Sequence, residues 1–484
     1  MELYRLRNYV ELALEMVSDT PTIRAAEVCA SWGGHQLVQV QHDTERPSDD
    51  VHALHTHTTG GLSFLVVLAE GEGRTVGFAM TDDELTPESL REALERARHS
   101  AMVEPRTLAF PRPLDDTPPP MSLYDPQVLD LPEDDVKQAA GEVMDGALTT
   151  LQEAGVVQQL RVRGAVRSQY EHLVVGNTEG LLASDTTTGL LATMTVHLLQ
   201  AQSRGYGSQV TTHRGDFVPY EAGMEAAQQA LRARGSIVLP GDDYEVVFGP
   251  RAVATLLQDV LLPALSLDTV ASGTSPFATQ RGQLIASPLL TMADNGRLPG
   301  LLGSRLMTGD GLPTSLTTLI EHGRLVGFLA DAYHAQHLWE HIGAVGPRHG
   351  LRHTTTGQSF SMRPGIFPTN ITFSSPEMVP LDDLLAPIVH GLYLGDLWHL
   401  TAPEGLQTGS CTGLIVGPSF VIRHGKLVEP VRPGTLRLQD NVLHVLQRLT
   451  GLSTTEQPIV LATRQSLVLA PEWRCSQVHV VASR

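Results

Sequence analysis

Apolar residues at helical spacing open the chain and predict an amphipathic helix that carries Leu3, Leu6, Val10, Leu14 and Val17 on one face. Shorter apolar runs follow, and they predict strands at residues 25–29, 36–41 and 62–69. Thr86 and Pro87 then fit the N-cap and first turn of a second helix. This order of elements predicts an N-terminal α/β domain over residues 1–104.

A proline-rich stretch separates this domain from the next. Seven prolines lie from Glu104 to Pro126, and proline at that density excludes helix and sheet interior. We therefore expect a linker over residues 105–131. Beyond it, apolar residues at helical spacing predict a helix over 132–154, and Gly155 ends it.

Alternating apolar segments follow this helix and predict an antiparallel sheet, with strands at residues 160–166, 172–175, 181–184 and 190–199. A further helix is predicted over 220–234, where Gly235 stops it. These elements predict a middle α+β domain over residues 132–236, with its helix packed on one face of the sheet.

The C-terminal half is rich in strand and turn signals. A strand is predicted at 243–248 and a helix at 251–264. His322-Gly323 and His424-Gly425 each separate two β-branched, apolar segments, which predicts two β-hairpins. The predicted fold class is therefore α+β: an N-terminal α/β unit, a middle α+β unit and a large β-rich C-terminal domain over 237–484.

Charge and composition limit the partners. The chain has 34 Lys and Arg against 53 Asp and Glu, a formal net charge of −19. This field repels phosphate backbones, so no direct contact with nucleic acid is expected. The first residues mix charges with apolar positions, unlike a signal peptide, and the longest apolar run, 62–69, is too short to cross a bilayer. Three scattered cysteines favour reduced thiols. We expect a cytoplasmic protein that does not enter a membrane.

His337, Glu340 and His341 form the clearest metal-binding pattern. On a helix, H-x-x-E-H puts two imidazoles on one face with a carboxylate beside them, which can hold zinc and polarise a water. His334, His349 and His353 lie near in sequence. The alternative is chance, because 20 histidines in one chain produce such spacings without function.

Other candidate chemistry has less support. His52, His55 and His57 alternate as metal ligands on a strand do, but an exposed edge strand or loop explains them equally simply. Cys411 has no obvious paired base, which favours a buried thiol over a nucleophile. The sequence contains no G-x-S-x-G elbow, P-loop or dinucleotide-binding glycine motif.

Several segments resemble one family in the same order and spacing. They are the loop and hairpin at 307–328 (MTGDGLPTSLTTLIEHGRLVGF), the turn GNTEG at 176–180, PTN at 368–370, Thr408-Gly409, and the strand pair FVIRHGKLVEPV at 420–431. Together they resemble the TldD/PmbA family, whose members were once described as modulators of DNA gyrase. The likeness covers most of the chain from about residue 160 onward.

The resemblance implies which kind of member this is. TldD-type members are zinc peptidases with H-E-x-x-x-H on a helix early in the C-terminal domain and a Cys ligand near the C-terminus. The matching helix here, 251–264, holds no His or Glu, and Thr463-Arg464-Gln465-Ser466 stands about where the Cys is expected. The chain therefore resembles the TldE/PmbA type, the partner without metal. Two departures are Gly309-Asp310-Gly311 in place of D-D-E-G, and Cys411 in place of the D of T-G-D.

The expected function is that of a TldE-like subunit of a peptidase acting on unfolded peptides. No catalytic residue and no cofactor is expected in this chain, and zinc is expected only in a TldD-like partner. The candidate peptide-contacting residues are Asp310, Gly311, Thr369 and Asn370, and turn or strand-end structure is their alternative role. Two other hypotheses stay open: a self-contained metallopeptidase with zinc at His337, Glu340 and His341, and a homodimeric peptide-binding scaffold.

Overall fold

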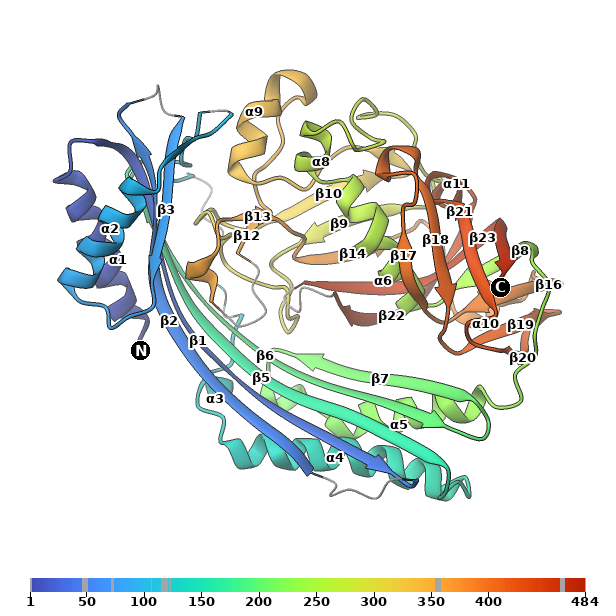
Figure 1. Cartoon of the computed structure of the whole chain (residues 1–484). Helices are drawn as coiled ribbons and strands as arrows, with labels where there is room; N and C mark the ends of the chain where they lie inside the picture. The colour runs from blue at the N-terminus through green and yellow to red at the C-terminus, as the bar shows by residue number, and fades with distance from the viewer. Residues whose placement is uncertain are drawn as a thin grey trace.

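A long curved sheet of seven antiparallel strands organises the computed structural model, and the C-terminal domain lies on its concave side (Figure 1). The structure describes residues 2–45, 51–70, 74–105, 107–114, 121, 123–352, 358–461 and 466–483. The strand order is β4-β3-β2-β1-β5-β6-β7. The strands are β1 Ile23–Asp43, β2 Val51–Leu68, β3 Thr75–Thr81, β4 Met102–Val103, β5 Leu160–Asn177, β6 Leu182–Leu198 and β7 Ser203–Thr211.

The first strand is longer than its apolar pattern predicts. The strands predicted at 25–29 and 36–41 are two parts of β1, which pairs with β2 on one side and with β5 on the other. These partners satisfy the backbone groups across Gly33 and Gly34, so the strand does not break there. A Cβ at Gly33 would lie 2.6 Å from the carbonyl oxygen of Tyr170, which explains the glycine. In the same way, β5 and β6 each join two of the predicted middle strands.

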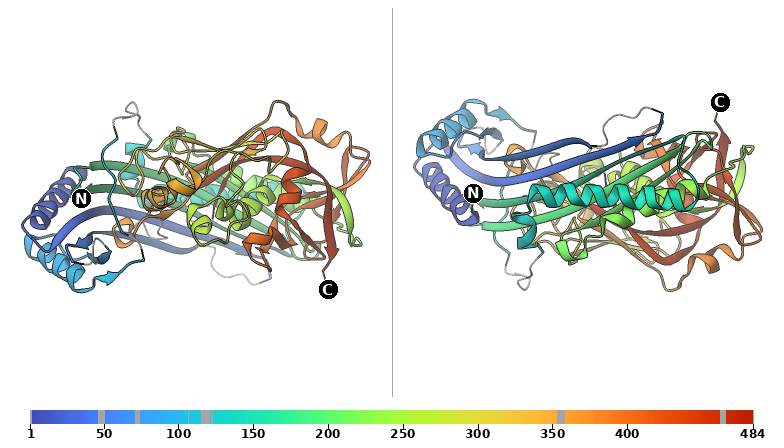
Figure 2. Two further views of the ribbon diagram at one scale, coloured as in Figure 1. Left: turned by 90° about the horizontal axis from the view of Figure 1, so that it is seen from above. Right: turned by 90° about the horizontal axis from the view of Figure 1, so that it is seen from below.

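Two pairs of helices cover the convex side of the sheet. Helices α1 (Leu3–Ser18) and α2 (Pro87–His99) close one core at the N-terminal end. Helices α4 (Glu133–Glu153) and α5 (Pro219–Arg232) close a second core at the far end, and α4 runs along the strands in the view from below (Figure 2). The helices predicted at 132–154 and 220–234 are confirmed to within two residues at each end.

The predicted units 1–104 and 132–236 thus contribute neighbouring strands, β1 and β5, to one sheet. The domain boundaries remain predictions. Within its described residues, the predicted linker, 105–131, contains a short helix, α3 (Pro126–Leu129). Proline does not prevent it, because Pro126 occupies the first turn and the Asp125 side chain accepts a hydrogen bond from Gln127 N.

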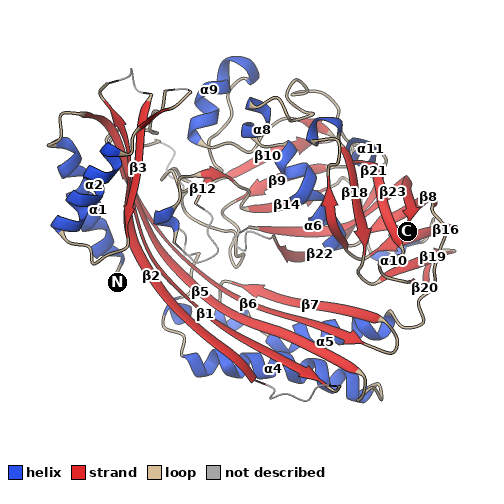
Figure 3. Ribbon diagram, viewed as in Figure 1, coloured by secondary structure: helices blue, strands red, loops and turns tan. Residues whose placement is uncertain are grey.

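A second, 14-stranded sheet forms most of the C-terminal domain, and β12 and β13 pair separately (Figure 3). Its main path is β11-β10-β9-β14-β23-β8-β16-β19-β20. The strands of the domain are β8 Asp242–Phe248, β9 Thr291–Asn295, β10 Leu316–Glu321, β11 Arg324–Leu325, β12 Gly350–Leu351, β13 Gly365–Ile366, β14 Asn370–Ser374, β15 Met378–Val379, β16 His390–Leu394, β17 Leu397–Thr401, β18 Ser410–Ile415, β19 Ser419–Arg423, β20 Lys426–Val431, β21 Leu436–Asn441, β22 Leu449–Val460 and β23 Leu467–Ala482. The predicted α+β class is confirmed.

Short helices pack against this sheet: α6 Pro250–Leu256, α7 Leu262–Ala264, α8 Leu267–Ala271, α9 Ala332–Ile342, α10 Leu381–Leu385 and α11 Val442–Gln447. The helix predicted at 251–264 is α6 and α7 joined by a π-helical turn at Leu257–Leu261. Pro263 explains the wide turn, because its ring has no N–H and crowds the carbonyl group one turn earlier.

Both predicted hairpins are confirmed. β10 pairs with β11 across His322-Gly323, and β19 pairs with β20 across His424-Gly425. All four turn residues have positive φ, 45° and 77° in the first turn and 48° and 76° in the second. This is the primed turn that suits twisted strands. No helix of the described chain is both long and apolar enough to cross a bilayer.

Candidate functional site

A cavity of about 850 Å³ lies between the far end of the long sheet and the C-terminal domain. Strand β7 and helix α5 form one wall, while α6 and the strands β16 to β19 contribute to the other. Apolar side chains such as Leu397, Val416 and Phe420 line it together with polar ones. A mixed lining of this kind is typical of ligand-binding cavities.

Arg251 on α6 connects the two walls. Its Nε lies 3.0 Å from Asp396 Oδ2, and its guanidinium carbon lies 3.8 Å from the ring centroid of Tyr206 on β7. The ion pair and the cation–π contact fix the side chain. Arg251 therefore holds α6 against β7 at the wall of the cavity.

The edge of β7 faces this cavity. β7 is the last strand of its sheet, so its outward amides are not used by a neighbouring strand. Tyr206 N donates to Gln229 Oε1 at 3.3 Å, and Ser208 N donates to Glu225 Oε2 at 3.4 Å. These distances are long for N–H···O bonds, so the side chains of α5 hold the edge weakly. An extended peptide could replace them by pairing with the strand.

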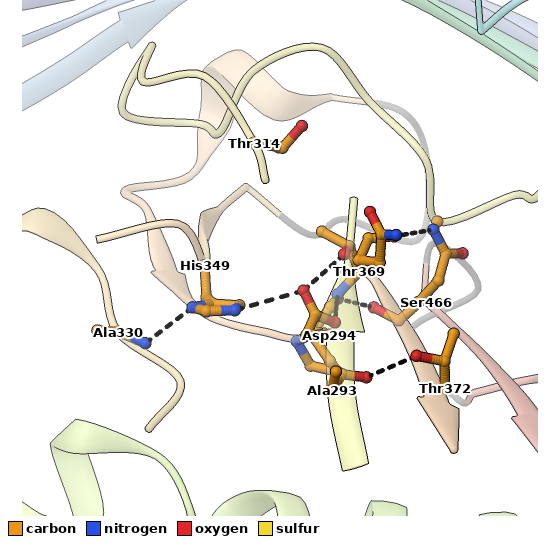
Figure 4. A network of polar contacts seen from close by, with 12 residues as sticks. Ala293, Asp294, Thr314, Ala330, His349, Thr369, Thr372 and Ser466 are labelled. Atoms are coloured by element: carbon orange, nitrogen blue, oxygen red, sulfur yellow. Dashed lines mark hydrogen bonds and ion pairs between the residues drawn. The ribbon is translucent and has the colours of Figure 1, made fainter. Parts of the chain in front are cut away.

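A buried polar network surrounds two of the predicted peptide-contacting residues (Figure 4). Asp294 accepts hydrogen bonds from Thr369 N at 2.7 Å and from Thr369 Oγ1 at 2.6 Å. Ala330 N donates to Nδ1 of His349, so the ring proton is on Nε2, 3.3 Å from Asp294 Oδ2. Asn370 Nδ2 donates to Asn295 O and Ser304 Oγ.

Thr369 and Asn370 are 1% and 0% exposed, so in this conformation both face the interior. They tie β14 to the end of β9. Their contact with a peptide remains a prediction. Sequence reasoning missed Asp294 and gave His349 no role except proximity to a histidine pattern, because only the fold brings these residues together.

Asp310 and Gly311 lie elsewhere, at the junction of the long sheet and the C-terminal domain. Asp310 lines a separate pocket of about 230 Å³ and is 7% exposed. Gly311 has φ 79°, which few other residues adopt, so the turn itself explains this glycine. The structure gives Gly311 a role in shaping its loop, and contact of Asp310 and Gly311 with a peptide remains a prediction.

The predicted histidine candidates have individual partners. Nδ1 of His337 lies 2.7 Å from Tyr333 O, while Glu340 and His341 are exposed. Nδ1 of His334 lies 2.8 Å from Asp331 Oδ1. His353 lies outside the described residues. Among the side chains that the structure describes, no three His, Cys, Asp or Glu are arranged to hold a metal ion.

The other sequence candidates lie on β2 and in the core. His55 and His57 are exposed, and His57 lies 5.7 Å from His35 between ring centroids; the His52 side chain is outside the described set. Cys411 is buried, as predicted, and burial raises the pKa of its thiol to about 12. A thiol with such a pKa is not a nucleophile at neutral pH.

Three carboxylates on neighbouring strands, of which Glu27 and Asp185 are buried and Glu171 is partly buried, hold the C-terminal domain on the concave face of the long sheet. Glu27 on β1 pairs with Arg352. Glu171 on β5 accepts hydrogen bonds from Ser359 N at 3.0 Å and from Ser359 Oγ at 2.8 Å. Asp185 on β6 accepts from Leu306 N at 2.7 Å. In the sequence, this contact between the long sheet and the C-terminal domain is indicated only by single acidic residues within otherwise apolar strands.

Docking through Glu171 predicts a pH dependence of stability. Burial raises the pKa of Glu171 to about 7, although Ser359 hydrogen bonds oppose the shift. The folded state therefore binds more protons than the unfolded state, and this stability is fully present below the unfolded pKa and is lost as pH rises from about 4.5 to about 7. Between these pH values, we expect Glu171→Gln to lose less unfolding free energy than the wild type, by on the order of 1–2 kcal/mol. Urea-unfolding curves of the variant and the wild type across that range measure this difference. Parallel pH profiles would contradict the assignment.

Parts of this chain are similar to known proteins. A profile of the PmbA/TldA metallopeptidase C-terminal domain matches residues 241–482, half of the chain. The chain belongs to the PmbA/TldD family. The metalloprotease TldD homologs of Haemophilus influenzae and Buchnera aphidicola subsp. Acyrthosiphon pisum are each 25% identical to it, over 57% and 60% of both chains. The match thus spans less than two thirds of these relatives' length.

The fold extends the likeness of this PmbA/TldD protein to the whole chain. The crystal structure of TldE from Thermococcus kodakarensis gives a TM-score of 0.80 at 18% identity, covering 98% of this chain and 99% of that one. A structure from Thermotoga maritima MSB8 gives 0.80 at 17% identity with the same coverage. The family resemblance carried by the sequence motifs is confirmed.

From the sequence resemblance, we expect α6 to correspond to the zinc-binding helix of TldD-type members of the PmbA/TldD family. Here the residues that α6 and the following π-helical turn present to the cavity include Arg251, Thr255 and Gln258. Zinc is bound in proteins by thiolate, imidazole and carboxylate groups, so a guanidinium, a hydroxyl and a carboxamide do not fit it. Residues 463–465, near the position of the family's Cys ligand, lie outside the described part of the chain.

Proposed function

We propose that this protein is a TldE-like subunit that binds an extended, unfolded peptide in the 850 Å³ cavity. Hydrolysis is assigned to a zinc-bearing, TldD-like partner chain, and this chain contributes peptide binding without zinc or catalytic residues of its own. The observation that carries the proposal is the composition of α6 and the π-helical turn after it, which line the cavity with Arg251, Thr255 and Gln258 where a metal helix would present imidazoles.

The free edge of β7 supports the peptide part of the proposal. Its amides donate long hydrogen bonds to Gln229 and Glu225, and a peptide strand offers carbonyl groups in a better geometry. Recognition through backbone groups suits unfolded substrates of varied sequence.

A peptide-binding experiment tests this role. A fluorescein-labelled unstructured peptide should bind the purified chain in the presence of EDTA. In buffer without EDTA, it should be cleaved only after a zinc-loaded chain with H-E-x-x-x-H is added. Tyr206→Pro removes the amide that faces the cavity, whereas Tyr206→Ala removes only the ring. We expect Tyr206→Pro to bind about tenfold more weakly than Tyr206→Ala, because one backbone hydrogen bond is lost.

Two results would contradict the proposal. Chelator-sensitive cleavage by the purified chain alone would make it a self-contained metallopeptidase. Failure to bind any unstructured peptide, with or without the partner, would leave a scaffold role. Equal affinities of Tyr206→Pro and Tyr206→Ala would exclude pairing with β7.

A further inference from the structure

The pocket of about 230 Å³ beside Asp310 is a second site, and it shares no lining residue with the large cavity. Its walls come from Glu27 on β1, the extended segment 108–111, the Asp310 loop and the first turn of α9. Arg363 and Glu104, which also line it, form a 2.9 Å ion pair with 43% and 33% of their side chains exposed. This pair marks the side on which the pocket reaches solvent.

Three carboxyl groups more than nine-tenths buried line the pocket: those of Glu27, Asp310 and Asp331. Two of them have close partners. Glu27 pairs with Arg352. Asp331 Oδ1 accepts a hydrogen bond from His334 N at 2.7 Å and lies 2.8 Å from His334 Nδ1.

Asp310 differs from the other two. Ala332 N donates a hydrogen bond to Oδ2 of its carboxyl group at 3.5 Å, which is at the limit of a hydrogen bond. A Cβ at Gly350 would overlap Asp310 Oδ2, so the backbone leaves room for this carboxyl group. The chain therefore holds a buried acid at the pocket wall with little to neutralise it.

Such an acid is costly unless a cation reaches it. Burial raises the pKa of Asp310 well above its ordinary value, and the charges of Glu27 and Asp331 raise it further, while Arg352 opposes them. A cation in the pocket would favour the ionised form, so binding would release a proton from Asp310.

We propose that this pocket binds the primary ammonium group of an organic amine. An ammonium group donates three hydrogen bonds and accepts none, and ionised carboxylates accept and do not donate. The pocket has the size of an amine end group rather than of a whole peptide, and Tyr333 adds an aromatic ring to its lining. A metal ion fits less well, since the described residues form no group of three metal ligands there. The site is independent of the peptide role proposed for the large cavity.

The pH dependence of binding is set by the groups around Asp310. Glu27, Asp331 and Glu104 attract an ammonium group, while Arg352 and Arg363 oppose it and His334 faces Asp331. Because Asp310 must lose a proton, affinity rises with pH until the carboxyl group is ionised in the free protein. The slope approaches tenfold per pH unit below that point.

Titration of the full chain with small probes tests the site. n-Butylamine stands for a lysine side chain and glycinamide for a peptide N-terminus, and n-butanol is the neutral control. By NMR, we expect at least one amine to bind at a single site while n-butanol does not, with affinity rising with pH for as long as the amine itself stays protonated. The stronger amine identifies the source of the ammonium group.

Variants at the site sharpen this test. Asp310→Asn should weaken amine binding at least tenfold and remove its pH dependence, and Gly350→Ala should weaken it by displacing the carboxyl group. Asp383→Asn, an exposed acid on α10, is the matched control and should bind as the wild type does. Should Asp310→Asn fail to fold, the wild-type pH slope and the n-butanol control decide the question. Equal binding of n-butanol, no binding of either amine, or displacement of the amine by calcium would overturn the proposal.

Discussion

Replacing Arg352 with methionine is expected to lower the free energy of unfolding by about 3–5 kcal/mol. Arg352 and Glu27 are 2% and 3% exposed and pair across the junction of the long sheet and the C-terminal domain. Arg352 Nε also donates to Gly309 O at 2.8 Å. The variant leaves the Glu27 carboxylate buried without its counter-charge. Urea unfolding measures the loss.

Two further variants give this prediction its controls. Adding Glu27→Gln to Arg352→Met should recover part of the lost stability, because the stranded charge is removed. Arg363→Met breaks the partly exposed pair with Glu104 and should cost less than about 1 kcal/mol. Similar losses for Arg352→Met and Arg363→Met would mean that the buried pair does not hold the domains together.

Gly223→Ala is expected to destabilise the protein by about 1–3 kcal/mol. Helices α4 and α5 touch through glycine, since a Cβ at Gly223 would overlap the carbonyl oxygen of Val143, and a Cβ at Gly146 would overlap that of Tyr220. Both obstacles are backbone atoms, which cannot move without displacing a helix. Thermal unfolding followed by circular dichroism measures the change.

Gly141→Ala in α4 is the matched control. A Cβ there would meet no atom within 4 Å, so alanine should stabilise the helix by up to about 1 kcal/mol through its higher helix propensity. The two substitutions are chemically identical and should have opposite signs. A stabilising Gly223→Ala would show that the two helices can separate without loss.

Local chemistry made some elements predictable. His322-Gly323 and His424-Gly425 define their hairpins because a two-residue turn depends on its own residues. The helix at Glu133–Glu153 follows from apolar spacing and a terminal glycine. The division of β1 into two strands was wrong because the neighbours that hold it together, β2 and β5, are distant in sequence.

The part of the candidate site that depends on the residue types within one helix could be predicted from the sequence. The contacts between segments that are distant in sequence could not. The absence of His and Glu from 251–264 is visible in the sequence and remains the basis for our proposal of a subunit without zinc. The pairing of Glu27 with Arg352 joins residues 325 positions apart, and no local pattern announces it. Thr369 and Asn370 were chosen from a family motif that the fold uses in its interior.

The continuity of the long strands has a mechanical consequence. β5 is 18 residues long and supplies Val174 to the core beneath α1 and Val162 to the core beneath α4. At about 3.3 Å per residue, this is a span of roughly 55–60 Å without a joint. A partner that binds α1 and α2 and tilts them would rotate one end of a continuous sheet. The opposite end of the same sheet includes β7, so this tilt would widen or narrow the 850 Å³ cavity that β7 lines.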